Sequence, residues 1–302
     1  MQVCRWFLPK MAGAPPLYSC AVYISSGLAS VATRAASAAA RTRDCAVVDT
    51  FCDVAYARSS VKLVGAARPL LEAARAAATE ALSLVDLSQE PHPAPHPRQG
   101  AVDMVAFMPL SELRCEAIGA ELASCDALAW EFGESLGAQG VPVLMFGGRA
   151  RRSLLEARRG TSFLASIKQE MPRESTASLP FDFGPPLPVP QRTGVGVVGS
   201  MPYVTNFNIQ VGGGASLADC RAAAARIRSE FGVQVMALPH AGETYEIGCN
   251  MQAAEGRDSP LTSAVLQAVV ASLPQDALIL RSYVVGLTPG DALARARGGA
   301  AA

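Results

Sequence analysis

Two of the three histidines, His92 and His96, lie in one short segment, residues 90–104, which reads EPHPAPHPRQGAVDM. Histidine suits acid and base roles near neutral pH, and the neighbouring prolines restrict the backbone and so the direction of the imidazole. Arg98 supplies a positive charge for a carboxylate, Gly100 allows close backbone approach, and Asp103 could hydrogen-bond an imidazole and fix its tautomer. The segment indicates acid–base chemistry; the alternative is a solvated Pro-rich loop with incidental histidines.

The second half of the chain has the pattern of a βαββαβ unit. Ser216 and Asp219 approximate a capping box that begins a helix, and Gly232 is a suitable stop for it. A second helix begins at Ser259-Pro260 and ends before Pro274. This order is that of the ferredoxin-like split βαβ unit. The strands that the pattern predicts are 203–211, 233–238, 245–251 and 277–285.

The first half repeats the same order and then adds further elements. Because the order occurs twice, we predict an α+β protein made of duplicated ferredoxin-like (βαββαβ) subdomains, with a ligand cleft between the two sheets. The predicted elements are strands 20–24, 45–49, 59–64 and 102–108 and helices 28–43 and 70–85, followed by helix 122–136, strand 141–146 and helix 151–169.

Residues 181–194, FDFGPPLPVPQRTG, separate the halves and contain four prolines and two glycines. Such a segment cannot continue a helix or a central strand, and it is either a domain linker or a functional loop. We place the division here. The predicted parts are a disordered or targeting tail at 1–17, an N-terminal subdomain at 18–183 and a C-terminal subdomain at 184–302.

Bulk properties exclude several functional classes. The 26 basic residues balance the 26 acidic ones, which argues against a general nucleic-acid or membrane-surface binder. Eight cysteines without a C-x-x-C pair favour reduced thiols and no metal site. No acidic residue precedes Asp44, which hints at an organelle transit peptide; since folded structure begins near Tyr18, we favour a cytoplasmic protein.

Residues 84–109 resemble the active-site segment of the glutamate formiminotransferase family. The family has a short DMS stretch there, then H-P-R-M-G-A-x-D and an apolar strand that ends in proline. His92 lies outside this pattern. The residues that match it are Asp86, Ser88, His96, Pro97, Arg98, Gly100, Ala101, Asp103 and Pro109.

Further stretches agree with this resemblance over about residues 20–295. VPVLMFG at 141–147 is similar to the family's VPVYLYG strand. Asp182-Phe183-Gly184-Pro185 matches DFGP, which opens the folate-contacting loop of the family and would correspond to residues 184–194 here. Asn206-Phe207-Asn208 is similar to FNIN, a strand that faces the ligand, and residues 285–289 resemble VGLVP.

The resemblance implies a one-carbon transferase of histidine and glutamate metabolism. It would move a formimino or formyl group between an N-substituted glutamate and tetrahydrofolate, which is a co-substrate, without a metal. In the family the histidine of H-P-R is the acid–base catalyst, so His96 takes that role here, with Asp103 beside it. The partners are these small molecules, with no nucleic acid or membrane, and a homodimer stays open. The implied substrate-binding residues are Arg58, Arg98, Gly100, Gly184, Pro185, Gly194, Gly199, Asn206 and Asn208.

The first strand departs from the family pattern VPNFSEG, because Tyr23 replaces the Asn and Ser26 replaces the Glu. Of an Asp and an Asn-Arg pair on the second strand and turn, aligned with Phe51, Ala57 and Arg58, only the Arg is kept. The alternative is therefore a non-catalytic folate-binding or interaction protein of the same fold. The helical cyclodeaminase domain of some relatives has no counterpart in this sequence, so ammonia release from formimino-folate is not assigned to it.

Overall fold

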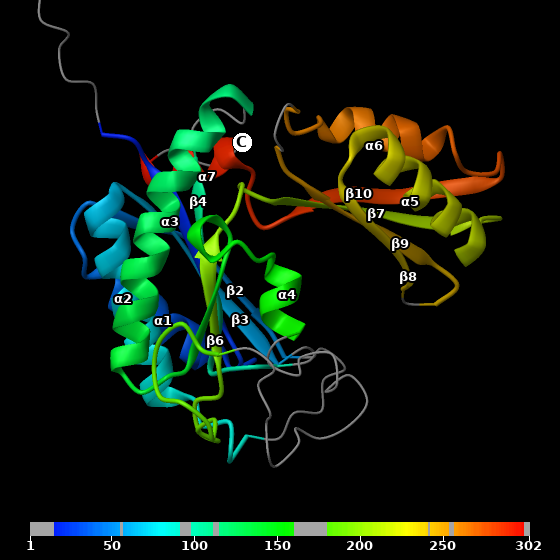
Figure 1. Cartoon of the computed structure of the whole chain (residues 1–302). Helices are drawn as coiled ribbons and strands as arrows, with labels where there is room; N and C mark the ends of the chain where they lie inside the picture. The colour runs from blue at the N-terminus through cyan, green and yellow to red at the C-terminus, as the bar shows by residue number, and fades with distance from the viewer. Residues whose placement is uncertain are drawn as a thin grey trace, which may run out of the picture.

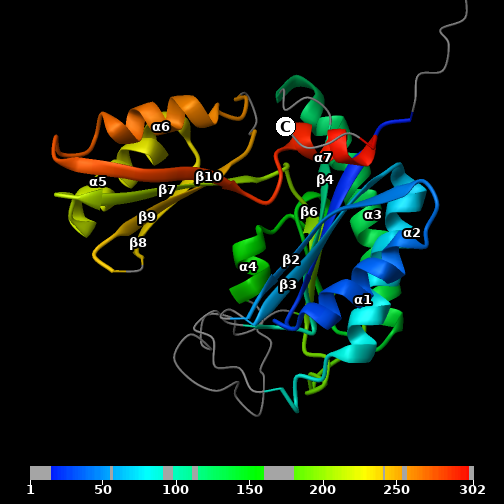
Figure 2. The ribbon, with the colours of Figure 1, turned by 180° about the vertical axis from the view of Figure 1, so that it is seen from behind.

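The computed structural model describes residues 15–54, 57–90, 98–110, 115–159, 180–240, 242–253 and 257–298. Within these residues the chain forms two β-sheets, and helices cover each of them, as Figures 1 and 2 show from opposite sides. The smaller sheet is built entirely from the last third of the chain, whereas the larger one uses the residues before it.

The larger sheet and its helices follow one another along the first 200 residues. Their bounds are β1 Tyr18–Ile24, α1 Ala29–Ala40, β2 Cys45–Asp53, β3 Arg58–Gly65, α2 Ala67–Leu84, β4 Val102–Pro109, α3 Cys115–Ala138, β5 Val143–Phe146, the 3-10 helix η1 Gly148–Ala150, α4 Leu154–Arg159 and β6 Gly196–Ser200. The strand order is β2-β3-β1-β4-β6-β5. Neighbours from β2 to β4 are antiparallel, and β6 runs parallel to both β4 and β5.

The smaller sheet repeats the order of the larger one. Its elements are β7 Thr205–Gly213, α5 Leu217–Phe231, β8 Gln234–Pro239, β9 Tyr245–Met251, α6 Thr262–Val270, β10 Ala277–Val285 and the terminal helix α7 Pro289–Ala296. Its strands lie in the order β10-β7-β9-β8. The same order, β4-β1-β3-β2, occurs inside the larger sheet, so the predicted α+β class with duplicated ferredoxin-like units is confirmed.

Small apolar residues hold the helices against the larger sheet. Leu70, Leu71, Ala74 and Ala78 form one buried face of α2, and the alanines of α1 let the two helices pack closely. Helices α1, α2 and α3 all lie on the same face of this sheet, as Figure 1 shows. The other face is therefore left for different elements to cover.

Helix α5 begins and ends where the sequence indicated. Its capping box is formed: the backbone N–H of Asp219 donates to Ser216 Oγ at 3.2 Å, and the backbone N–H of Ser216 donates to the Asp219 carboxylate at 2.9 Å. Gly232 ends the helix with φ of 65°, a conformation that glycine adopts without strain. Helix α6 begins at Thr262, two residues later than the Ser259-Pro260 start that we predicted.

Two elements were absent from the sequence prediction. Strand β6 enters the larger sheet between β4 and β5, so this sheet extends to Ser200. The division of the chain at 183/184 itself stays a prediction.

Helix α7 returns to the larger sheet, where Leu287 and Ala292 are buried with Val48 on the face opposite α1. Of the helix predicted at 151–169, α4 covers 154–159, and residues 160–169 lie outside the described ranges.

Candidate active site around Asp103

The candidate site lies at the amino ends of the parallel strands β4 and β6, where β1 ends and β3 begins. The pairing of β1 with β4 shifts register between Tyr23 and Ile24, and the backbone N–H of Ser25 then donates to Ala101 O at 3.0 Å. Such an irregularity redirects the side chains beside it. Ser25, directly after β1, and Asp103, on the adjacent strand β4, are both buried.

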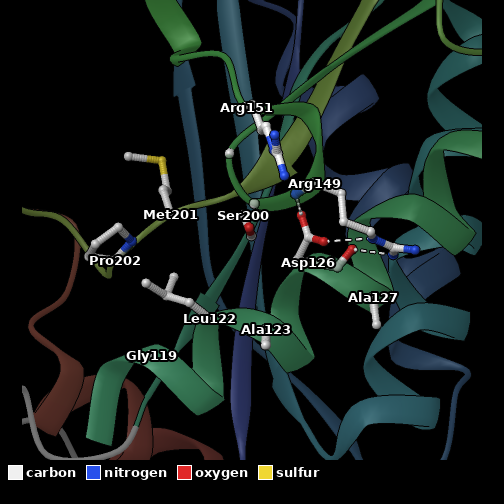
Figure 3. A pocket seen from close by; sticks show the side chains of 12 residues that line it. Gly119, Leu122, Ala123, Asp126, Ala127, Arg149, Arg151, Ser200, Met201 and Pro202 are labelled. Atoms are coloured by element: carbon white, nitrogen blue, oxygen red, sulfur yellow. Dashed lines mark hydrogen bonds and ion pairs between the residues drawn. The ribbon is translucent and has the colours of Figure 1, made fainter. Parts of the chain in front are cut away.

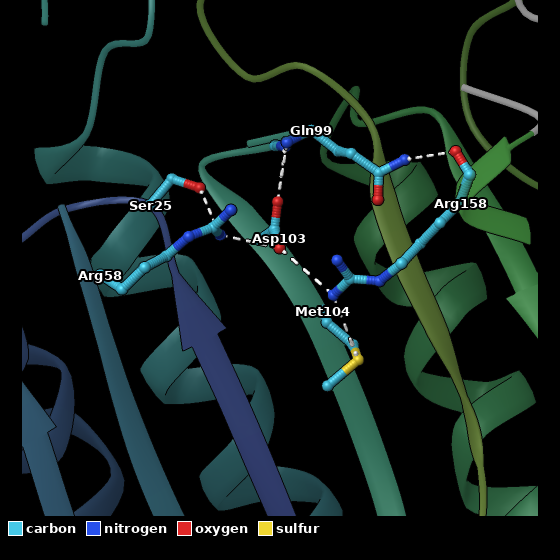
Figure 4. Close-up of polar contacts among 7 residues, drawn as sticks. Ser25, Arg58, Gln99, Asp103, Met104 and Arg158 are labelled. Carbon is cyan, nitrogen blue, oxygen red and sulfur yellow. Dashed lines mark hydrogen bonds and ion pairs between the residues drawn. The ribbon is translucent and has the colours of Figure 1, made fainter. Parts of the chain in front are cut away.

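Asp103 gathers both backbone and side-chain donors (Figure 4). Its Oδ1 accepts from the backbone N–H of Gln99 at 2.7 Å and more weakly from that of Gly100 at 3.4 Å. Its Oδ2 lies 2.8 Å from Arg58 Nη1 and 3.5 Å from Arg158 Nη2. The carboxylate is therefore the centre of a buried, charge-assisted network that fixes the loop before β4.

The two arginines come from elements far apart in sequence. Arg58 is the first residue of β3 and also donates to Ser25 Oγ at 3.0 Å, whereas Arg158 lies at the end of α4. Burial lowers the pKa of Arg158, and Asp103 opposes this shift. Sequence reasoning missed Arg158, because nothing in the spacing of the Arg-rich segment 149–159 sets it apart from its neighbours.

Arg98 lies within the protein rather than at its surface. It is 8% exposed, and its Nη2 donates to Leu87 O at 3.0 Å and to Glu90 O at 2.7 Å. Burial lowers its pKa as well, with Glu90 opposing the shift. The Arg98 guanidinium thus links the loop before β4 to residues 87–90, which follow α2. Its predicted role as a carboxylate ligand stays a prediction.

Gly100 and Gly194 bring two predicted functional segments together. They form an isolated antiparallel bridge, with Ala101 N–H donating to Thr193 O at 2.8 Å and Val195 N–H donating to Gln99 O at 2.9 Å. A Cβ on Gly100 would collide with the carbonyl of Val195, and Gly194 has φ of 63°. The Pro-rich segment is therefore hydrogen-bonded directly to the segment that follows His96.

Gly184 and Pro185 lie near the start of β5. The backbone of Phe183 bridges Val143, and Gly184 has φ of 86° at a place where a Cβ would meet the carbonyl of Val141. Asp182, the first residue of the DFGP match, accepts from Arg152 Nη1 at 3.0 Å and from Met145 N at 2.8 Å. In this chain the acid of the motif thus holds its own loop against β5.

Gly199 is buried in the middle of β6, between Ala106 of β4 and Phe146 of β5. A Cβ there would strike the carbonyl and ring of Phe146. Like Gly100 and Gly184, Gly199 therefore has an evident packing role. Arg58, Arg98, Gly100, Asp103 and Gly194 converge around the start of β4, whereas Gly199 lies further along the sheet.

Asn206 and Asn208 lie on the smaller sheet, on the face of β7 that is turned away from its buried residues. Asn206 Nδ2 donates to Asn250 Oδ1 at 2.7 Å, and Asn208 Nδ2 donates to Glu246 Oε1 at 2.9 Å. Glu246 also accepts from the Tyr283 hydroxyl at 2.5 Å. These polar side chains therefore form an ordered surface across three strands.

His92 and His96 lie outside the residues that the structure describes. Of the positions that depart from the family pattern, Ser26 is 1% exposed and its Oγ accepts from Leu28 N at 3.4 Å. Burial raises the pKa of Tyr23, and the charge of Arg158 opposes this. Tyr23 thus lies beside the Asp103 network.

Two features are absent from the described ranges. Those residues hold no group of three or more His, Cys, Asp or Glu side chains that could bind a metal ion. They also contain no helix whose length and hydropathy suit a membrane span.

Comparison with known proteins places these features in a family. Residues 17–201 match the model of the formiminotransferase domain, N-terminal subdomain. A formiminotransferase cyclodeaminase-like protein of Arabidopsis thaliana is 30% identical over 251 residues, which cover 77% of this chain and 80% of that protein. Glutamate formimidoyltransferase of Thermoplasma acidophilum is 25% identical over 256 residues, covering 82% and 79%.

A longer relative is matched over a smaller share of its own length. Formimidoyltransferase-cyclodeaminase of Gallus gallus is 32% identical over 178 residues, which are 58% of this chain but only 30% of the chicken protein. The match to the subdomain model and the extent of the plant alignment show that the chain belongs to the formiminotransferase family.

Proposed function

We propose that this chain transfers a formimino or formyl group between an N-substituted glutamate and tetrahydrofolate. The observation that carries the proposal is the direct backbone pairing of the loop before β4 with the Pro-rich segment at Gly100 and Gly194. The first of these segments follows the proposed catalytic His96, and the second is the proposed folate-contacting loop. Their pairing supports a single site in which both act.

The proposed chemistry needs a base, and His96 is the candidate. As folate N5 attacks the formimino carbon, the imidazole takes the N5 proton, and the imidazolium then returns a proton to the departing glutamate nitrogen. The reaction is balanced without a redox step. Holding both substrates side by side removes much of the entropic cost of a bimolecular step. We propose Asp103 as a positioning residue, because its carboxylate fixes the Gln99-Gly100 backbone that follows the histidine.

Arg58 is the proposed ligand of a glutamate carboxylate, together with Arg98. Both guanidinium groups lie around the start of β4, and Arg158 adds a third positive charge there. Charge-assisted bonds from arginine suit carboxylate recognition. Asn206 and Asn208 are proposed to meet the folate from the smaller sheet, across the proposed cleft.

The test is turnover with tetrahydrofolate and N-formiminoglutamate or N-formylglutamate, followed by the absorbance of the substituted folate. His96→Ala should abolish turnover and keep most of the folate affinity. His92→Ala is the matched control and should retain turnover, since that histidine lies outside the family pattern. A wild-type protein that binds folate but transfers neither group contradicts the proposal.

Such a protein would instead fit the second candidate, a non-catalytic folate-binding or interaction protein. The observation that favours it is the loss of polar groups at the end of β1, where Tyr23 and Ser26 stand in place of Asn and Glu. Absence of folate binding contradicts both candidates. A cytoplasmic location and a homodimer also belong to the proposal and are tested by cell fractionation and by sedimentation.

A further inference from the structure

A cavity of about 800 Å³ lies at the carboxyl ends of β5 and β6 (Figure 3). Asp103 lies at the other end of these parallel strands, near the amino end of β4. It lies between the first half of α3, the turn that follows β5 and the residues that follow β6. The carboxyl ends of adjacent parallel strands are common places for ligands in α/β sheets. Gly147, with φ of 79°, turns the chain there, and a Cβ at this position would collide with the carbonyl of Ser200.

Most of the cavity wall is apolar. Leu122, Ala123 and Ala127 contribute from α3, and Met201 and Pro202 contribute from the segment after β6. Both alanines are exposed, so the wall of α3 that faces the cavity is accessible. Such a lining, with a few polar groups, is typical of a small-molecule site. A ligand that fills it therefore needs an apolar body.

One acid and one base of the cavity neutralise each other. Asp126, which is 5% exposed, accepts from Arg149 Nε at 2.8 Å and from Arg149 N at 3.3 Å. The Arg149 guanidinium also lies 4.9 Å from the centre of the Trp130 ring. Because the two charges offset each other, this ion pair adds no net charge to the cavity.

Arg151 is the third charged residue that lines the cavity. It is exposed, and within the described ranges its side chain makes no hydrogen bond or ion pair. Its backbone is held at φ of 52°, a left-handed conformation, by hydrogen bonds from its N–H to Gly147 O and Gly148 O. A residue other than glycine seldom adopts this conformation without support. The side chain is thus projected from a fixed turn.

Ser200 supplies a second polar group. It lines the cavity, only 5% of the residue is exposed, and its hydroxyl has no hydrogen-bond partner among the described residues. A group bound in the cavity can accept a hydrogen bond from this hydroxyl.

We propose that this cavity is a second binding site, separate from the one around Asp103, for a small amphipathic monoanion. Its apolar body lies against Leu122 and Met201, its carboxylate or sulfonate pairs with Arg151, and Ser200 donates a hydrogen bond to it. The proposal does not depend on the transfer chemistry at Asp103. It predicts that one apolar anion binds independently of folate.

The test uses 8-anilinonaphthalene-1-sulfonate, whose fluorescence reports transfer to an apolar site, and N-phenyl-1-naphthylamine, which has the same aromatic body without the charge. We expect saturable binding of one sulfonate probe per chain. Arg151→Gln should weaken it about tenfold, the loss of one charge-assisted contact, and should leave the uncharged probe unaffected. Ala123→Trp, at an exposed position on the cavity wall, should obstruct the cavity and abolish binding of both probes.

Arg34→Gln is the charge-matched control, because Arg34 is exposed and pairs with Glu80 on the other helices of this face. It should bind the sulfonate probe as the wild type does. Thermal unfolding of each variant verifies that it is folded. Probe binding that Arg151→Gln and Ala123→Trp leave unchanged overturns the proposal. Competition between tetrahydrofolate and the probe for one site overturns the claim of a separate site.

Discussion

The Oδ2 atom of Asp103 lies 2.8 Å from Nη1 of Arg58, and their side chains are only 2% and 11% exposed. This pair joins the first residue of β3 to the second residue of β4 across β1, which lies between them in the sheet. A buried pair of this kind contributes less through its own attraction than it costs when one member is removed. It makes the start of β4 sensitive to single substitutions.

Asp103→Asn removes the negative charge that Arg58 and Arg158 face. We expect the free energy of unfolding to fall by about 3–5 kcal/mol, as when one partner of a buried ion pair is lost, and formimino transfer to fall with it. Urea denaturation measures the first effect. Glu131→Gln is the control: its ion pair with Arg68 is exposed, so the loss should stay below about 1 kcal/mol. Equal losses in both variants contradict the assignment.

Gly100→Ala tests the contact between the loop before β4 and the Pro-rich segment. The added Cβ collides with the carbonyl of Val195, and the backbone must shift, at a cost of about 1–3 kcal/mol. We expect weaker binding of tetrahydrofolate, measured by calorimetry. In the helical control Gly119→Ala the new methyl group meets nothing within 4 Å, and the stability should rise by about 0.5–1 kcal/mol. Unchanged stability of Gly100→Ala contradicts the close approach.

Lys62 should make the stability depend on pH. Burial lowers its pKa from 10.5, with Asp49 opposing the shift. At this site the unfolded chain therefore binds more protons than the folded one just below pH 10.5, so the Lys62 contribution to the free energy of unfolding rises with pH in that window. The buried tyrosines and cysteines, whose pKa values are raised, contribute in the opposite direction. The free energy of unfolding of the wild type minus that of Lys62→Met should therefore rise with pH. The same difference measured in a Tyr203→Phe background, which lacks the hydroxyl bonded to Lys62 but keeps the amine, should rise as well. Parallel pH profiles of wild type and Lys62→Met would be inconsistent with a depressed Lys62 pKa.

Glu246→Gln alters the polar network of the smaller sheet. Burial raises the pKa of Tyr283, and its hydrogen bond to Glu246 raises it further. Replacing the carboxylate by a neutral amide should move that pKa back toward 10.0, as followed by ultraviolet titration of tyrosinate. Tyr283→Phe identifies the transition. We also expect weaker folate binding, because Asn208 is oriented by Glu246; a Tyr283 transition at its wild-type pH contradicts the coupling.

The βαββαβ order of elements along each half could be predicted from the sequence, because the alternation of strands and helices was regular in each half. Strand β6 could not. Its sequence GVVGS is short and contains two glycines, and it is a strand because β4 and β5 lie on either side of it. Helix α7 had a local signal, a capping box of Thr288 and Asp291 with proline at its start.

The segment containing Asp103 was located by its motif, but its partners were not. We expected its carboxylate to hydrogen-bond an imidazole, and within the described residues it binds two arginines and the backbone of Gln99. Spacing in the sequence indicates which residues share a loop. It does not indicate that Arg158, 55 positions later, approaches from α4, because such contacts depend on how the helix packs. The role of His96 stays a prediction.

Helix α7 has a consequence for biosynthesis. Leu287 and Ala292 cover an apolar face of the larger sheet formed by Ala21, Val48 and other residues made more than two hundred positions earlier. During translation that face stays open until the smaller sheet has been synthesised and the last helix has left the ribosome. A nascent chain that stalls before residue 287 therefore presents an uncovered apolar surface to chaperones.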